Sequence, residues 1–390
     1  MHPPPSPAHT LPVDADRATL VGRAWVPGAG PTPVAVRGAM LVDLSALAPT
    51  VSLLLDRPDC VAAVQQARAP AVGTLDDALA APAGEADALR LLAPCDLQPV
   101  KAAGVTFAAS LVERVIEEQA RGDPARAQSV RAQVLAAIGV DLASLRPGSA
   151  EATRLKALLV ARGLWSQYLE VGIGPDAEIF TKAPPMSAVG TACAIGLHPD
   201  SVWNNPEPEV VLAVDSRARI VGAALGNDVN LRDFEGRSAL LLGKAKDNNG
   251  SCAIGPFIRL FDAHFGLDDL RRAVVNLRVE GAGDGFVLEG ESSMARISRD
   301  PLELVAQAMG ATHQYPDGMM LFCGTMFAPV QDRGAPGEGF THRLGDRVTI
   351  ASERLGALVN EVQHSDRIAP WTFGIGALMD NLARRRLLAR

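Results

Sequence analysis

The sequence predicts an α+β protein whose larger part is built on a mixed or antiparallel β core. From about residue 170 onward, short apolar runs rich in strand-forming residues follow one another: AEIFTK, EVVLAV, RIVGAAL, AVVNLRVE, MMLFCG and RVTIAS. Few helical segments separate these runs, whereas a doubly wound parallel sheet needs crossover helices between its strands. Residues 17–95 alternate short apolar runs with Pro and Gly, which predicts a smaller α+β unit made of hairpins.

A helical region is predicted between these two parts. Ser110 and Glu113 have the spacing of a capping box, so we expect a helix to begin there. Its charged side chains are typical of a solvated face with ion pairs: Glu113, Arg114, Glu117, Glu118 and Arg121.

Four further helices are predicted. Asp123-Pro124 marks the start of a second helix that ends at Gly139, and residues 150–163 form a third. Near the C-terminus, Asp300-Pro301 predicts another helix start, and residues 373–390 are expected to close the chain as a helix.

The chain is expected to divide into a disordered tail over residues 1–16, a small N-terminal domain over 17–95 and a larger domain over 96–390. The proline-rich start lacks the apolar core of a signal peptide, and no apolar run is long enough to span a membrane. The five cysteines are odd in number, scattered and never spaced as C-x-x-C, which favours free thiols in a reducing cytoplasm.

Charge and motifs exclude some classes of function. A formal net charge of -7 argues against a general nucleic-acid binder, because phosphate binding needs a basic surface. The sequence has no Walker loop and no G-x-G-x-x-G fingerprint, since the glycines of GAGDG at 281–285 fit a turn. We therefore expect no nucleotide cofactor.

Three carboxylates are predicted to converge on one hairpin. Glu207 and Glu209 lie in the predicted strand EPEVVLAV and are two residues apart, so their side chains share a face. If Val214 pairs with Arg219 across a four-residue loop, Glu207 lies opposite Gly226, and Asp228 joins the same face. Such a group repels itself unless a cation is bound, and an all-oxygen ligand set favours Mg²⁺ or Mn²⁺. The alternative is an acidic, solvent-facing strand end.

Several segments together carry a family resemblance. Six of them occur in this order: GVTF at 104–107, AEIFTK at 177–182, NPEPEVVLAV at 205–214, GNDVNLRDFEG at 226–236, GKAKDNNGSCAIGP at 243–256 and CGTM at 323–326. With these segments the chain resembles the fumarylacetoacetate hydrolase superfamily over about residues 100 to 380. More closely, the whole chain, including WSQYLE at 165–170 and GDRVTI at 345–350, is similar to the long-form sugar-acid dehydratases. Those enzymes act on 2-keto-3-deoxy-pentonates such as those derived from D-xylonate and L-arabinonate.

The resemblance implies a fold, a cofactor and a site. It implies a mixed β-sandwich roll for a catalytic domain over 96–390, a homodimer and bound Mg²⁺. Glu207, Glu209 and Asp228 match the metal carboxylates. The resemblance also gives Lys244 as the active-site lysine, Glu178 as an acid/base residue and Thr325 as a contact of the substrate carboxylate.

The expected reaction is loss of water from a 2-keto-3-deoxy-pentonate to give 2-oxoglutarate semialdehyde. Three carboxylates leave about three of six Mg²⁺ positions open, and a 2-oxo acid can fill two of them, which acidifies its C3 hydrogens. Lys244 would stabilise the enolate and Glu178 would remove the C3 proton. For the departing C4 hydroxyl, Glu178, Ser110 or a water could supply the proton.

Two other functions stay open at this stage. A metal-dependent C–C hydrolase or decarboxylase of a 2-oxo or diketo acid could use the same metal enolate. Hydrolases of the family often carry a lid His with a Glu, and the segment KAAGVTFAASLVERVIEE contains no histidine, which favours dehydration. A sugar-acid binding protein that has lost catalysis is the third possibility.

Overall fold

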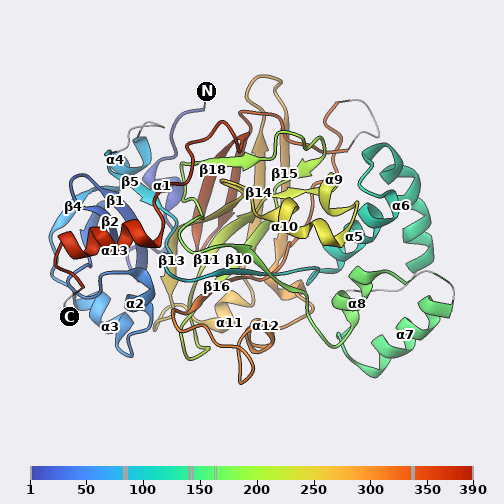
Figure 1. The fold of residues 1–390 in the computed structure, drawn as a ribbon, viewed down its shortest axis with the longest axis horizontal. Helices are drawn as coiled ribbons and strands as arrows, with labels where there is room; N and C mark the ends of the chain where they lie inside the picture. Colours follow the sequence, from blue (N-terminus) through green and yellow to red (C-terminus); the bar gives the residue numbers. More distant parts are fainter. Residues whose placement is uncertain are drawn as a thin grey trace.

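Two β-sheets packed face to face form the centre of the protein, with helices at both ends (Figure 1). The computed structural model describes residues 2–81, 87–138, 142, 145–161, 163, 165–334 and 339–388. Each of the six predicted apolar runs contains a strand, and the predicted α+β class is confirmed. Within the described residues, no helix is both long and apolar enough to cross a membrane.

The larger sheet has eleven strands in the order β4-β3-β2-β1-β13-β11-β10-β16-β6-β7, with β5 paired to β1. Its strands are β1 (Leu20–Val26), β2 (Gly30–Arg37), β3 (Met40–Asp43), β4 (Ala71–Thr74), β5 (Arg90–Leu92), β6 (Val100–Ala103), β7 (Ile179–Ala183), β10 (Pro208–Val214), β11 (Ile220–Asp228), β13 (Cys252–Leu260) and β16 (Met319–Phe322). The pair β16–β6 is parallel and β10–β11 is antiparallel, so the sheet is mixed.

The second sheet has five strands in the order β15-β14-β17-β18-β8. These are β8 (Ala194–Leu197), β14 (Val274–Glu280), β15 (Val287–Ser293), β17 (Arg347–Ser352) and β18 (Gly356–His364). A short pair, β9 (Asn204–Asn205) and β12 (Asn230–Leu231), joins the segments that enter β10 and leave β11.

The helices lie mainly at the two ends of the molecule (Figure 1). At the N-terminal end are α1 (Pro7–Thr10), α2 (Val51–Leu55), α3 (Cys60–Gln66), α4 (Leu75–Ala80) and α13 (Ile375–Arg384). At the opposite end are α5 (Ala108–Ala120), α6 (Pro124–Ile138), α7 (Ala150–Ala161) and α8 (Gln167–Ile173). Shorter helices are α9 (Arg232–Glu235), α10 (Leu242–Lys246), α11 (Leu267–Leu270), α12 (Pro301–Ala308) and the 3-10 turns η2 (Ala239–Leu241) and η3 (Met294–Arg296).

Strand β10 shows how the core is divided. Val210 and Leu212 point into the core between the two sheets, where they pack with residues of β14 and β17. Val211 and Ala213 point to the other face, which α2 and α3 cover. Because side chains alternate along a strand, Glu207 and Glu209 belong to the second face. That face is apolar along the strand and becomes acidic where the strand begins.

The N-terminal segment is joined to the rest of the chain through the larger sheet. Leu20 and Val21 of β1 pair with Arg259 and Ile258 of β13. Within the segment that we expected to be a disordered tail, residues 7–10 form α1, and Asp14 accepts a 2.7 Å hydrogen bond from the buried Arg259 guanidinium. This ion pair ties the segment to the central sheet. The division at about residue 95 stays a prediction.

The predicted capping box at Ser110 is wrong. Helix α5 begins two residues earlier, with Phe107 as its N-cap, and the Ser110 hydroxyl donates back to the Phe107 carbonyl at 2.9 Å. Glu113 does not cap the helix either, because its Oε2 accepts a 2.8 Å hydrogen bond from Arg131.

Two other predicted helix starts are confirmed. Helix α6 starts at Pro124 as predicted, and the predicted end at Gly139 lies outside the described residues. Helix α12 starts after Asp300, whose side chain accepts from the Leu302 N–H at 2.9 Å. The closing helix α13 is shorter than predicted.

Candidate metal centre

The β10–β11 hairpin brings the three predicted carboxylates together, in a register that differs from the predicted one. Glu209, not Glu207, lies opposite Gly226. The turn contains five residues instead of four, and a bulge follows Ala213, so the partners shift by two positions. A shift of two keeps every side chain on its face. The Asp228 N–H donates to the Glu207 carbonyl at 3.1 Å, which places these two residues side by side.

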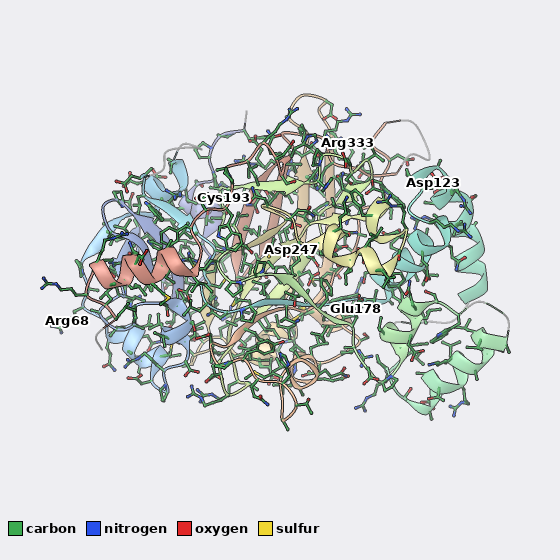
Figure 2. The ribbon with its side chains drawn as sticks, viewed as in Figure 1. Arg68, Asp123, Glu178, Cys193, Asp247 and Arg333 are labelled. Atoms are coloured by element: carbon green, nitrogen blue, oxygen red, sulfur yellow. The ribbon has the colours of Figure 1, made fainter. Side chains whose placement is uncertain are left out.

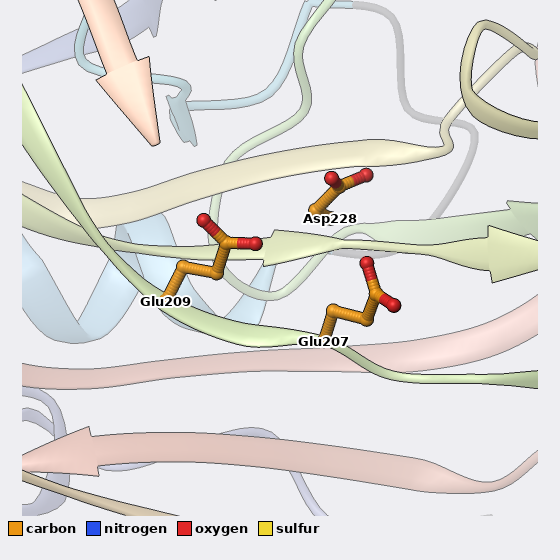
Figure 3. A group of neighbouring side chains, drawn as sticks. All are labelled: Glu207, Glu209 and Asp228. Atoms are coloured by element: carbon orange, nitrogen blue, oxygen red, sulfur yellow. The ribbon is translucent and has the colours of Figure 1, made fainter. Parts of the chain in front are cut away.

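Glu207, Glu209 and Asp228 form a compact, buried set of oxygen ligands (Figure 3). One carboxylate oxygen from each lies within 4.8 Å of the others. The three residues are only 2, 1 and 2% exposed, so the alternative of a solvent-facing strand end is excluded.

The three carboxylates have different partners. Glu209 accepts hydrogen bonds from the Gly324 N–H at 2.6 Å and the Thr325 hydroxyl at 3.2 Å, both neutral donors. Asp228 Oδ1 lies 2.9 Å from the fully buried Lys182 ammonium of β7. Thr325, predicted as a substrate contact, therefore lies at the edge of the carboxylate set.

The lysine beside the carboxylates is Lys246, not the predicted Lys244. Lys246 Nζ lies 2.6 Å from Glu207 Oε2 and 3.2 Å from Asp228 Oδ2. Lys244 is exposed, and its ammonium lies 4.9 Å from the Phe234 ring centroid. Both lysines belong to α10, where residues two apart point about 200° away from each other. Only one of them can face the carboxylates.

Helix α5 supplies a second group of charges that the sequence predicted to be solvated. Arg114 is buried and contacts three carboxylates: Glu117 at 2.6 Å, Glu235 at 3.1 Å and Glu207. Glu117 also lies 3.3 Å from the Arg232 guanidinium. The expectation of a solvated face is wrong for these residues, because acids on neighbouring elements partner them inside the protein.

Glu178 lies where the central sheet meets the end of the molecule that contains α5 to α8 (Figure 2). Its carbonyl accepts from the Gly104 N–H at 3.1 Å, and a Cβ at Gly104 would come within 1.9 Å of its Oε2. Glycine at this position therefore leaves room for the Glu178 carboxyl. Ser110 lies one helical turn before Arg114, and its hydroxyl is held by the Phe107 carbonyl.

Burial and like charges perturb the acids. Burial raises the pKa of Glu209 well above its usual range, and the charges of Asp228 and Glu207 add to the effect. Burial also raises the pKa of Glu178, and it raises the pKa of Glu235 to about 7. For Asp228 the burial effect is outweighed by Lys182 and Lys246, so its pKa is lowered.

These residues fit a divalent cation. We call the whole set the charged cluster; it contains six carboxylates (Glu117, Glu178, Glu207, Glu209, Asp228, Glu235) and four cations (Arg114, Lys182, Arg232, Lys246). If all are ionised, two negative charges are left over, which one divalent ion balances. The carboxylate oxygens of Glu207, Glu209 and Asp228 are hard donors, suited to Mg²⁺ or Mn²⁺.

Residues 202–363, which hold the hairpin and most of this cluster, match the family model described as fumarylacetoacetate (FAA) hydrolase C-terminal. Over these residues the chain is similar to the FAA hydrolase family. The match confirms the resemblance stated from the sequence motifs.

Two curated relatives and two solved structures are similar to this chain. The chain is 32% identical over 194 residues to a 2-dehydro-3-deoxy-D-arabinonate dehydratase of Saccharolobus solfataricus, covering 49% of this chain and 60% of that relative. It is 30% identical over 195 residues to a probable 2-keto-3-deoxyxylonate dehydratase of Haloferax volcanii, covering 50% of this chain and 63% of that relative. The chain thus spans less than two thirds of the length of either relative.

The fold of a solved 2-keto-3-deoxy-D-arabinonate dehydratase in its apo form is similar, with a TM-score of 0.61, 20% identity, and coverage of 88% of this chain and 99% of that one. A second structure, described as complexed with magnesium and 2,5-dioxopentanoate, gives a TM-score of 0.60 at 20% identity, covering 90% of this chain and all of that one. These likenesses show the fold.

Several residues of the cluster were missed from the sequence. Lys182 and Lys246 lie in two of the motif segments, AEIFTK and GKAKDNNG, so a signal for them was present. Glu235 lies in a third of these segments, GNDVNLRDFEG, so it too carried a signal. Arg114 and Glu117 lie outside the segments and carried none, because a charged helix surface has the same sequence pattern whether its partners are water or buried acids.

Proposed function

We propose that this protein is a Mg²⁺-dependent dehydratase that converts a 2-keto-3-deoxy-pentonate to 2-oxoglutarate semialdehyde, which is 2,5-dioxopentanoate. The buried set of Glu207, Glu209 and Asp228 with Lys246 beside it carries the proposal. The names of the curated relatives support the substrate class, and the magnesium and 2,5-dioxopentanoate of a structural neighbour support the cofactor and product.

Glu207, Glu209 and Asp228 would hold the ion through their carboxylates. When bound, Mg²⁺ would supply Lewis-acid polarisation of the 2-oxo acid. Lys246 takes the role first given to Lys244: its ammonium would stabilise the negative charge that develops on the C2 oxygen. The fixed ion pairs of Lys246 keep its charge in place before the reaction starts.

Glu178 would remove the C3 proton. Its partly buried carboxylate lies near Lys246 and Arg114, and burial with the charges of Asp228 and Glu207 raises its pKa, which makes it a stronger base. Thr325 lies at the edge of the site, where it could contact the substrate carboxylate. Loss of the C4 hydroxyl then gives an enone with a terminal CH₂OH, which would rearrange to the semialdehyde.

The proposal includes a cytoplasmic location and a homodimer, as the resemblance and the free thiols suggest. All five cysteines are unpaired thiols. The domain over 96–390 would carry the catalytic residues, with residues 17–95 packed against it.

An assay with each C4 epimer of 2-keto-3-deoxy-pentonate tests the function. We expect one epimer to yield 2-oxoglutarate semialdehyde. Coupling to a semialdehyde dehydrogenase measures this product. No product with either epimer would reject the dehydratase. Water incorporation into a cleaved diketo acid, or release of CO₂ from a 2-oxo acid, would then establish the hydrolase or decarboxylase instead.

A further inference from the structure

The proposed dehydration needs an acid at C4 as well as a base at C3, because hydroxide is a poor leaving group. Glu178 is committed to the C3 proton. The Ser110 hydroxyl, the earlier candidate, already donates to the Phe107 carbonyl at 2.9 Å, and it is a weak acid. A carboxyl group suits this task better.

Glu235 is a buried carboxyl group that the steps described so far do not use. It ends α9 and is 4% exposed. Its Oε2 lies 3.1 Å from Arg114 Nη1 and 3.9 Å from Lys246 Nζ. Neither contact has the geometry of a hydrogen bond, and among the described residues nothing else donates to this oxygen. One lysine ammonium therefore lies between Glu235 and the metal carboxylates.

Glu235 also lines a cavity of about 510 Å³. It lies between α5, α8 and the segment after α9, and Arg121, Tyr168 and Arg237 also line it. Of the charged cluster's residues, Glu235 is the one that lines this cavity. Glu235 therefore lies beside the cavity and, through Lys246, next to the metal carboxylates. Burial raises its pKa to about 7, so both protonation states are populated near neutral pH.

We propose that Glu235 is the catalytic acid that protonates the departing C4 hydroxyl. This rests on the proposed dehydratase function. The C3–H proton passes to Glu178, and its electron pair forms the C3=C4 double bond. The C4–O bond breaks with its electron pair on oxygen, the Glu235 proton joins that oxygen, and water leaves. Arg114 and Lys246 stabilise the resulting carboxylate, which takes a new proton from cavity water.

The test separates the two halves of the reaction in Glu235→Gln. General acid catalysis contributes about 10²–10⁴-fold, so we expect dehydration to fall by at least about 100-fold. The rate at which the C3 protons exchange with D₂O should stay within a few-fold of the wild-type rate. NMR on unreacted substrate measures this exchange. A 4-deoxy-4-fluoro analogue should release fluoride at a near wild-type rate, because fluoride leaves without a proton.

Glu170→Gln, on α8 outside the cluster, is the matched control and should leave all three rates unchanged. Glu235→Asp keeps an acid one methylene away and should recover part of the dehydration. The assignment of Glu235 as the acid would be overturned if the Glu235→Gln variant dehydrated normally. It would also be overturned if the variant lost C3 exchange and fluoride release together with dehydration. Failure of the wild type to dehydrate either epimer would instead reject the proposed function on which it rests.

Discussion

Lys244 and Lys246 are two residues apart in the sequence and have opposite surroundings in the protein. We expect Lys246→Met to lower turnover by at least about 100-fold, the effect of losing one oxyanion-stabilising donor. The metal-free protein should also lose about 3–5 kcal/mol of unfolding free energy, because Glu207 and Asp228 lose a buried partner. Steady-state kinetics measures the turnover, and urea unfolding measures the unfolding free energy.

Lys244→Met is the control for this pair. Its side chain is exposed, so the unfolding free energy should change by no more than about 0.5 kcal/mol and turnover should be kept. If Lys244→Met were the inactive variant, the assignment of Lys246 would be wrong.

Glu209 makes metal binding depend on pH. A carboxyl whose pKa is raised on folding binds more protons in the folded than in the unfolded chain. Its contribution to stability is therefore present below its unfolded pKa of about 4.3, and is lost as the pH rises through its folded pKa.

A cation replaces that proton, so we expect Mg²⁺ binding near neutral pH to release protons and to weaken as the pH falls. Calorimetry in buffers of different ionisation enthalpy measures the release. A Mg²⁺ affinity that is independent of pH between about pH 5 and pH 8, with no proton release, would contradict the raised pKa of Glu209.

The metal carboxylates could be predicted from the sequence because strand alternation is simple to apply. A two-residue error in register still left Glu207, Glu209 and Asp228 on one face. The lysine could not be chosen in the same way, since the phase of the five-residue helix α10 depends on what it packs against.

Among the helices and strands, α5 differs most from what the sequence predicts. Its residues Arg114 and Glu117 link the helix to α9 and to the metal centre. We expect Arg114→Met to cost about 3–5 kcal/mol of unfolding free energy, because three buried carboxylates lose a partner. Arg154→Met, which breaks an exposed pair with Glu151 on α7, should cost at most about 1 kcal/mol. Equal effects in urea unfolding would show that Arg114 is solvated after all.

At the scale of the whole molecule, the α+β class followed from the strand-rich pattern, whereas the continuity of the large sheet did not. Pairing of β1 with β13 joins segments more than 230 residues apart, which local patterns do not reveal. The same long-range contact fixes the segment expected to be a tail, through Asp14 and Arg259.

Removal of residues 1–16 should therefore destabilise the protein. Loss of the Asp14 carboxylate leaves the Arg259 guanidinium buried without its partner, at a cost of about 3 kcal/mol or more. Asp14→Asn alone should reproduce much of this loss in urea unfolding. A truncated protein as stable as the full chain would support the original expectation of a disordered tail.

The proposed dehydration depends most on a metal ion held by the three carboxylates. The most direct test titrates Mg²⁺ into EDTA-stripped wild type and Glu207→Gln, with the substrate epimer that the wild type accepts. We expect wild-type activity to need Mg²⁺, and Glu207→Gln to lose both Mg²⁺ binding and turnover. Full activity of the stripped wild type, or of Glu207→Gln, would contradict the account.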